Sequence, residues 1–321
     1  MPYREGFEVL KHIVCPSRRP FIAALGFMLL AAWPAPLPLY AGPEAPTGAA
    51  EAPAAAAPPK KRVAVLSSAE EPKSNTSQGL YIQILRDAGF EARAIDAAEV
   101  REKKLAGCDI FIIGGGSGTA FNKSLGPEGG KVVQDFIRHG GGALASCAGG
   151  YSFVNGQNEA LKYIAIAKAS CLDTQDGRWA RGKAEVEIVP ADDHYRPLTM
   201  FYANGPLWEI AKEQGADRTV ALARYKSDVK KEGDAGGIMP GTPAILGGTY
   251  GDGRFVLFSA HPEFHKSLGN YPLLCDAARW VTRGRLKPEE SIRWEDVFPS
   301  SAKREAEADK PVTSSAEPGK P

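Results

Sequence analysis

The chain has 321 residues, of which 43% are hydrophobic and 24% are charged, and its formal net charge is +1. This is an ordinary globular composition with enough apolar material for a core. The near-zero charge, without any stretch that interleaves basic and aromatic residues, argues against nucleic acid or an anionic surface as partner.

Residues 1–41 have the pattern of an export signal. Lys11, Arg18 and Arg19 precede the apolar run 21–33, which has the length of a signal-peptide core and is short for a bilayer span of roughly 20 residues. An imperfect cleavage site follows at 39–41. We therefore expect a periplasmic or extracellular protein. The alternative is an uncleaved N-terminal anchor, which would be its only contact with a membrane.

Composition also marks the limits of the folded part. Residues 42–60 are mostly Ala, Pro, Gly and Glu, which is typical of a linker, and residues 300–321 are polar and charged, which is typical of a disordered tail. The expected folded unit is therefore residues 61–299, as one α/β domain.

Hydrophobic periodicity predicts alternating strands and helices in the first half of this unit. The predicted order is strand 62–66, helix 78–88, strand 91–95, strand 109–113, a helix with the apolar stripe 132–137, and strand 143–146. Such alternation predicts a mostly parallel sheet with helices on both faces. The second half is less regular. It has predicted strands at 184–189, 220–224, 244–250 and 254–259, and an amphipathic helix over 268–281.

A cysteine follows the strand 143–146 within the sequence GGALASCAGGYSFV, which runs from Gly141 to Val154. Small residues on both sides of Cys147 allow a sharp strand-to-helix turn that exposes the residue at its corner, as in the nucleophile elbow of hydrolases. At a helix N-terminus the helix dipole and free N–H groups favour a thiolate. The alternative is an inert, buried cysteine in a tight turn.

A histidine and a glutamate follow the last predicted strand, in the sequence His261-Pro262-Glu263. Pro262 favours an extended backbone at His261, and residues two apart in an extended segment point the same way. His261 could then take the proton of Cys147 while Glu263 orients the imidazole. A surface histidine is the alternative.

Glycines follow the buried strand 109–113. Gly115 and Gly116 would let backbone N–H groups approach a ligand closely, and with the N–H of Ala148 they could form an oxyanion hole. A flexible loop is the alternative.

These three segments, in this order, resemble the class I glutamine amidotransferase-like superfamily. The resemblance implies a flavodoxin-like fold with Cys147 as nucleophile, His261 as base, Glu263 as its partner, and Gly115 and Gly116 in the oxyanion loop. The sequences CAGGYSF and YANGP (202–206) resemble most closely the N-terminal domain of some eukaryotic biotin–protein ligases, which also occurs alone in bacteria.

The sequence departs from that family at Ala145, where glutaminases usually have glycine. We also see no synthetase domain that would use released ammonia, so we do not transfer the glutaminase substrate. The expected function is a cysteine-dependent amidase or related hydrolase of a small molecule or peptide, which needs no metal or organic cofactor. The alternatives are a non-catalytic module that binds a ligand or partner, and a redox protein in which Cys147 is oxidised.

Other candidate residues are weaker. Tyr202 and Asn204 could hydrogen-bond a substrate, or could simply belong to an Asn-Gly turn. Three further cysteines lie in the predicted domain and are expected to be small buried residues or disulfide partners: Cys108, Cys171 and Cys275.

Overall fold

The structure is a computed structural model of the whole chain, and it describes residues 59–155, 163–172, 182–192, 194–287 and 289–301. The predicted export signal, nearly all of the predicted linker and residues 302–321 of the predicted tail lie outside the described residues. Ser300 and Ser301 are described. Ser300 binds the carboxylate of Asp276 with its backbone N–H (2.7 Å) and its hydroxyl (3.0 Å).

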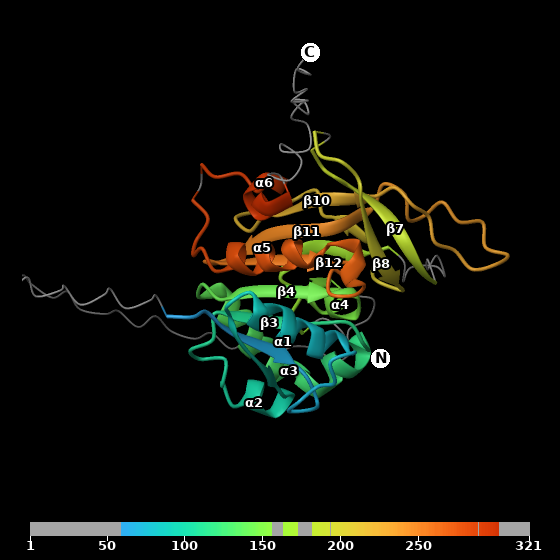
Figure 1. Cartoon of the computed structure of the whole chain (residues 1–321). Coiled ribbons are helices and arrows are strands. Elements are labelled where there is room, and N and C mark those ends of the chain that lie inside the picture. Colours follow the sequence, from blue (N-terminus) through green and yellow to red (C-terminus); the bar gives the residue numbers. More distant parts are fainter. Residues whose placement is uncertain (1–58, 156–162, 173–181, 193, 288, 302–321) are drawn as a thin grey trace, which may run out of the picture. The chain divides into compact units, whose positions relative to one another are not determined.

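A nine-stranded sheet forms the centre of the described chain, with the strand order β2-β1-β3-β4-β12-β11-β10-β7-β8 (Figure 1). The strands, in chain order, are β1 (Arg62–Leu66), β2 (Glu91–Ile95), β3 (Ile110–Ile113), β4 (Gly142–Ser146), β7 (Lys183–Pro190), β8 (Leu198–Ala203), β10 (Thr219–Tyr225), β11 (Pro243–Tyr250) and β12 (Gly253–Phe258). A small second sheet contains β5 (Val154–Asn155), β6 (Ala167–Cys171) and β9 (Trp208–Ile210).

The parallel half of the large sheet has the flavodoxin-like order. Strands β2, β1, β3, β4 and β12 pair in parallel, which is the arrangement 2-1-3-4-5 of that fold. The predicted flavodoxin-like fold is therefore confirmed. The remaining pairings, from β12 through β11, β10 and β7 to β8, are antiparallel.

Helices cover both faces of the parallel half. The helical segments are α1 (Ser77–Asp87), α2 (Ala97–Arg101), α3 (Gly118–Arg138), η1 (Cys147–Gly149), α4 (Gly150–Phe153), η3 (Lys266–Leu268), α5 (Tyr271–Val281) and α6 (Trp294–Val297). Apolar residues of α1 and α5 pack on one face, while those of α2 and α3 pack on the other. Alternate residues of β3 belong to the two cores, Ile112 to the first and Phe111 to the second, which explains why this strand is apolar throughout.

Periodicity located most elements but missed the short or polar ones. The residues of β8 were expected to lie partly in a polar loop, because Asn204 and Gly205 directly follow them; Tyr202 is in fact in the strand. The short elements α2, β6 and β9 were also not predicted. β9 has only three residues and β6 (AKASC) has no large apolar side chain, so neither shows a recognisable period, and the two strands form by pairing with each other.

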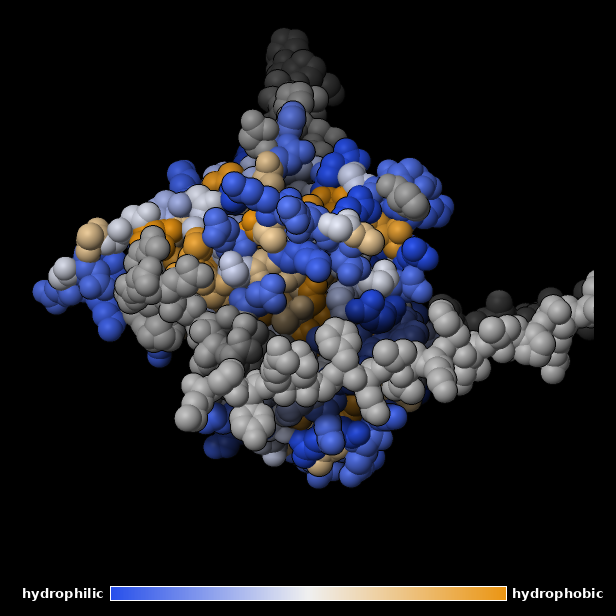
Figure 2. Space-filling view, turned by 180° about the vertical axis from the view of Figure 1, so that it is seen from behind, coloured by the Kyte–Doolittle hydropathy of each residue, from blue (hydrophilic) through white to orange (hydrophobic). Residues whose placement is uncertain are grey.

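The surface of the described residues is mixed. Figure 2 shows mainly hydrophilic side chains on the face opposite to that of Figure 1, with smaller hydrophobic areas between them. No helix among the described residues is long and apolar enough to span a membrane. The cysteines at 108, 147 and 275 are free thiols.

Candidate active site

Cys147 stands at a strained corner after β4. Its φ is +49°, a left-handed conformation that is costly for a residue with a side chain. The 3-10 turn η1 and the single-turn helix α4 follow, so the chain reverses within a few residues. A Cβ on Gly149 would lie 1.9 Å from the carbonyl oxygen of Ile113, so only glycine fits there. The elbow thus packs on the end of β3. Because α4 is one turn long, its dipole supports a thiolate less than the expected helix would.

The structure brings Cys147, His261 and Glu263 together. His261 follows β12, and its side chain hydrogen-bonds with the side chain of Cys147. On the other side of the ring, Nδ1 lies 2.8 Å from Oε1 of Glu263. The three side chains are buried, with 6% of Cys147, 4% of His261 and none of Glu263 exposed. The thiol, the imidazole and the carboxylate therefore contact one another in the order that the predicted nucleophile, base and orienting group require.

The backbone of His261 is held by strand β8. Its N–H donates to the carbonyl of Phe201 over 2.8 Å, which forms an isolated bridge between the two segments. The side chain also packs tightly on the glycine turn, since a Cβ on Gly115 would lie 2.5 Å from Cε1 of the imidazole. Both contacts restrict the ring to one orientation.

Glu263 is the centre of a buried hydrogen-bond network. Its Oε1 accepts from the hydroxyl of Ser77 (2.6 Å) and from that of Ser146 (2.9 Å), in addition to the contact with His261. In the described part of the chain no group donates to Oε2. Burial and the charge on Glu263 raise the pKa of Tyr81, whose ring is fully buried nearby. The carboxylate is thus held rigidly through one oxygen.

Burial and charge act in opposite directions on His261. Burial by itself would lower the pKa of the imidazole, but the charge of Glu263 and the hydrogen bonds to Cys147 and Glu263 outweigh it and raise the pKa of His261 to about 10. At neutral pH the imidazole therefore carries its proton. An imidazolium in contact with the sulfur would stabilise the thiolate that attacks a carbonyl in the predicted chemistry.

This shift predicts a pH-dependent stability. His261 binds its proton more tightly folded than unfolded, so its contribution is fully present below pH 6.5 and is lost as the pH rises through about 10. We expect the free energy of unfolding of the wild type to fall relative to that of His261→Gln by on the order of 2–5 kcal/mol between pH 6.5 and pH 10. Urea unfolding of both proteins at several pH values measures this. A difference that does not change with pH would contradict it.

The two N–H groups of the glycine turn that are predicted to bind an oxyanion, those of Gly115 and Gly116, differ in their hydrogen bonds. The N–H of Gly115 donates to the hydroxyl of Ser77 over 2.7 Å, so it is already used. The N–H groups of Gly116 and Ala148 make no hydrogen bond within the described residues. Gly116 is exposed and has a φ of +149°, which favours glycine. Gly116 and Ala148 are therefore the groups that could stabilise an oxyanion.

The segment 202–206 meets the site through its backbone. Sγ of Cys147 lies 3.2 Å from the carbonyl oxygen of Ala203, which accepts a hydrogen bond when the sulfur is a neutral thiol. Tyr202 is fully buried and its hydroxyl donates to the carbonyl of Gly205 over 2.9 Å. Asn204 has a φ of +57°, and its side-chain oxygen accepts from the N–H of Gly182 over 2.7 Å. In this structure both predicted substrate-binding side chains thus make contacts that shape the loop; their binding of a substrate stays a prediction.

Aromatic side chains surround the far side of the imidazole. Phe264 meets His261 edge-on with ring centroids 4.8 Å apart, and Phe201 is stacked on His265 at 4.5 Å. Nδ1 of His265 lies 3.6 Å from Oε1 of Glu185. His265 is exposed and thus lies at the rim of the site.

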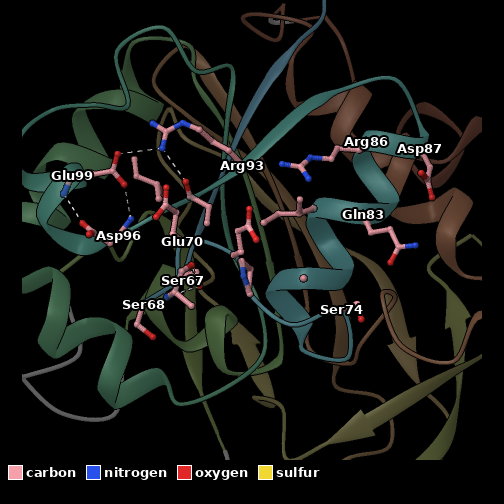
Figure 3. Close-up of a pocket in the computed structure, with 17 residues that line it drawn as sticks. Ser67, Ser68, Glu70, Ser74, Gln83, Arg86, Asp87, Arg93, Asp96 and Glu99 are labelled. Atoms are coloured by element: carbon pink, nitrogen blue, oxygen red, sulfur yellow. Dashed lines mark hydrogen bonds and ion pairs between the residues drawn. The ribbon is translucent and has the colours of Figure 1, made fainter.

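A separate cavity of about 780 Å³ lies at the ends of β1 and β2 and contains none of the three catalytic candidates (Figure 3). Two of its charged side chains form an ion pair with each other. Arg93 binds Glu99 at 3.2 Å, and the backbone N–H of Asp96 donates to the same carboxylate. Arg86 donates to the carbonyl of Ala92 over 2.8 Å. This cavity offers no nucleophile and base pair among its lining residues.

No family model and no curated protein matches this chain. Several solved structures are similar to it. A putative ThuA-like protein from Bacteroides uniformis is 14% identical, with a TM-score of 0.45, over 72% of this chain and 94% of that one. A putative GMP synthase component from Thermoplasma acidophilum is 13% identical, with a TM-score of 0.41, over 70% and 98%. A β-galactosidase from Bacillus circulans sp. alkalophilus is 15% identical, with a TM-score of 0.41, over 69% of this chain, which spans only 31% of that enzyme. At these values the likeness concerns the fold, which the strand order establishes independently.

Three groups that contact the candidate site were not predicted from the sequence: the hydroxyls of Ser77 and Ser146 and the backbone carbonyl of Ala203. Ser77 looks like a helix-capping residue, but the cap of α1 is Thr76, whose hydroxyl accepts from the N–H of Gly79 over 3.2 Å. Ser146 looks like one more small residue before the elbow. The carbonyl of Ala203 belongs to the backbone, which no sequence motif reports. Only the position of Ser146 next to Cys147 offered a signal.

Proposed function

We propose that this protein is an exported cysteine-dependent amidase or related acyl-transfer hydrolase that acts on an amide or ester of a small molecule or peptide. One observation carries the proposal. A continuous line of contacts runs from the sulfur of Cys147 through the imidazole of His261 to the buried carboxylate of Glu263. Such a line is required for activating a thiol, and a binding site has no need of it.

In the proposed acylation step the thiolate of Cys147 attacks the carbonyl carbon, and the carbonyl oxygen becomes an oxyanion. The N–H groups of Gly116 and Ala148 stabilise that charge. When the tetrahedral intermediate collapses, the bond to the leaving nitrogen or oxygen breaks and the imidazolium of His261 donates its proton to it. The product is a thioester on Cys147 with a neutral His261.

In the deacylation step neutral His261 removes a proton from a water molecule, which attacks the thioester carbonyl. The carbon–sulfur bond breaks, the acid is released, and Cys147 returns as a thiolate beside the imidazolium. Glu263 keeps its charge throughout and stabilises the imidazolium in both steps.

The resemblance to the biotin–protein ligase N-terminal domain supports a finer assignment within the amidotransferase-like fold. The two segments that carry the resemblance, CAGGYSF and YANGP, meet at the site, because the sulfur of the first lies 3.2 Å from a carbonyl oxygen of the second. We include the family in the proposal for this reason. Because residues 1–41 are expected to be an export signal, we also propose that the protein is located in the periplasm or the extracellular space.

Acylation by p-nitrophenyl acetate tests the proposal. The full chain should release a burst of one equivalent of nitrophenol, and mass spectrometry should find the acetyl group on Cys147. Cys147→Ala should show no burst. Cys275→Ala is the matched control and should keep the full burst, because this cysteine lies on α5 and burial raises the pKa of its thiol.

Other outcomes favour the alternatives. A Cys147 that is not acetylated and is alkylated no faster than a free cysteine, with no change in His261→Gln, would contradict the proposal and favour a binding module. A Cys147 that is not acetylated but readily forms a sulfenic acid with hydrogen peroxide would favour a redox protein.

A further inference from the structure

Ser77 links two parts of the site that are distant in the sequence. It is the first residue of α1 and is 5% exposed. Its hydroxyl accepts a hydrogen bond from the N–H of Gly115 (2.7 Å) and donates one to Oε1 of Glu263 (2.6 Å). The oxyanion turn and the catalytic carboxylate therefore share one hydroxyl group.

The direction of this chain of hydrogen bonds follows from chemistry. A backbone N–H can only donate and a carboxylate only accepts, so the single proton of the hydroxyl must point at Glu263 while a lone pair faces Gly115. Removal of this hydroxyl would leave the buried N–H of Gly115 without an acceptor and would take one of three contacts from Oε1 of Glu263.

Steric contacts hold the same three segments together. A Cβ on Gly114 would lie 2.4 Å from Oγ of Ser77, and one on Gly115 would lie 2.5 Å from Cε1 of His261. The glycine turn thus packs on Ser77 and on the imidazole at once. The N–H of Gly116, the proposed oxyanion donor, belongs to the next peptide unit, whose direction depends on the backbone angles of Gly115 and whose carbonyl accepts from Nε2 of Gln78 over 2.8 Å.

We infer that Ser77 is a positioning residue that sets the oxyanion turn and the Glu263–His261 pair in a single geometry. The inference rests on the proposed function. Ser77 does not touch the sulfur or the substrate; it acts through Gly115 and through Glu263. Ser146 provides the comparison, because its hydroxyl donates to the same oxygen of Glu263 and has no hydrogen bond to the glycine turn.

The test compares Ser77→Ala with Ser146→Ala. Alkylation of Cys147 by iodoacetamide needs no oxyanion stabilisation, whereas acylation by p-nitrophenyl acetate does. We expect alkylation at pH 6 to fall by a similar few-fold in both variants, because each removes one donor from Glu263. Acylation should fall by a further ~10-fold or more in Ser77→Ala only. Ser77→Thr, which keeps the hydroxyl, should restore the ratio of acylation to alkylation.

Hydrogen exchange gives a readout that does not depend on acylation. In the wild type the Gly115 amide should exchange at least ~10-fold more slowly than that of exposed Gly116, since it is hydrogen-bonded and buried. Ser77→Ala should remove this protection and Ser146→Ala should keep it.

The results separate the two proposals. A wild type that is not acylated would refute the proposed function, while Gly115 exchange would still decide the role of Ser77. If Gly115 is unprotected in the wild type, or if Ser77→Ala and Ser146→Ala give the same exchange and the same acylation-to-alkylation ratio, the inference about Ser77 is wrong.

Discussion

His261→Gln is expected to lower the rate of Cys147 acylation by about 10²–10⁴-fold. Glutamine has a similar reach and can still donate to Glu263, but it neither carries a charge beside the sulfur nor transfers a proton to a leaving group. The loss should be largest near pH 6. There the imidazolium, whose pKa is raised to about 10 despite burial because of Glu263 and the contact with Cys147, is fully charged in the wild type.

His265→Gln is the matched control for this prediction. It changes a histidine in the same segment that is exposed and stacked on Phe201 at 4.5 Å. We expect its acylation rate to stay within about 3-fold of the wild type, since such a rim contact is worth at most about 1 kcal/mol. The alkylation rate of His261→Gln should approach that of the wild type above pH 10, where the wild-type imidazole is neutral. Equal rates for wild type and His261→Gln at pH 6 would contradict the proposed role of the imidazole.

Glu263→Gln is expected to reduce acylation by about 10²–10³-fold and the free energy of unfolding by about 2–4 kcal/mol. In the wild type one carboxylate oxygen accepts from the hydroxyls of Ser77 and Ser146 and contacts Nδ1 of His261. A neutral amide oxygen attracts these donors less strongly, and the amide NH₂ has no acceptor waiting at the position of Oε2. The imidazolium also loses the charge that stabilises it.

Urea unfolding and p-nitrophenyl acetate acylation of the same protein samples measure both effects. Glu185→Gln is the control, because this glutamate is exposed and its Oε1 lies 3.6 Å from Nδ1 of His265, away from the buried network. It should change stability by no more than about 0.5 kcal/mol and leave acylation unchanged. A Glu263→Gln protein that acylates like the wild type would show that the buried carboxylate only supports the fold.

The sequence by itself determined the elements with strong local patterns. The apolar runs of β1, β3 and β12 and the stripe of α5 lie where periodicity predicted them, because such patterns depend only on neighbours along the chain. The small residues around Cys147 predicted a sharp corner in the backbone, and in the structure Cys147 has a left-handed φ of +49°. The alternation of strands and helices predicted a mostly parallel sheet, and the family resemblance implied its flavodoxin-like arrangement.

Only the tertiary structure decided which distant groups meet. The hydroxyl of Ser77 reaches Glu263 across 186 positions of the chain, and the carbonyl of Ala203 reaches Cys147 across 56. These contacts depend on the register of β8 beside His261 and on where α1 begins against the glycine turn, and a backbone carbonyl or a capping-like serine has no sequence pattern of its own. The sequence predicted strands at the positions of β7, β10 and β11, but their antiparallel pairing and the addition of β8 at the edge of the sheet were decided by long-range contacts.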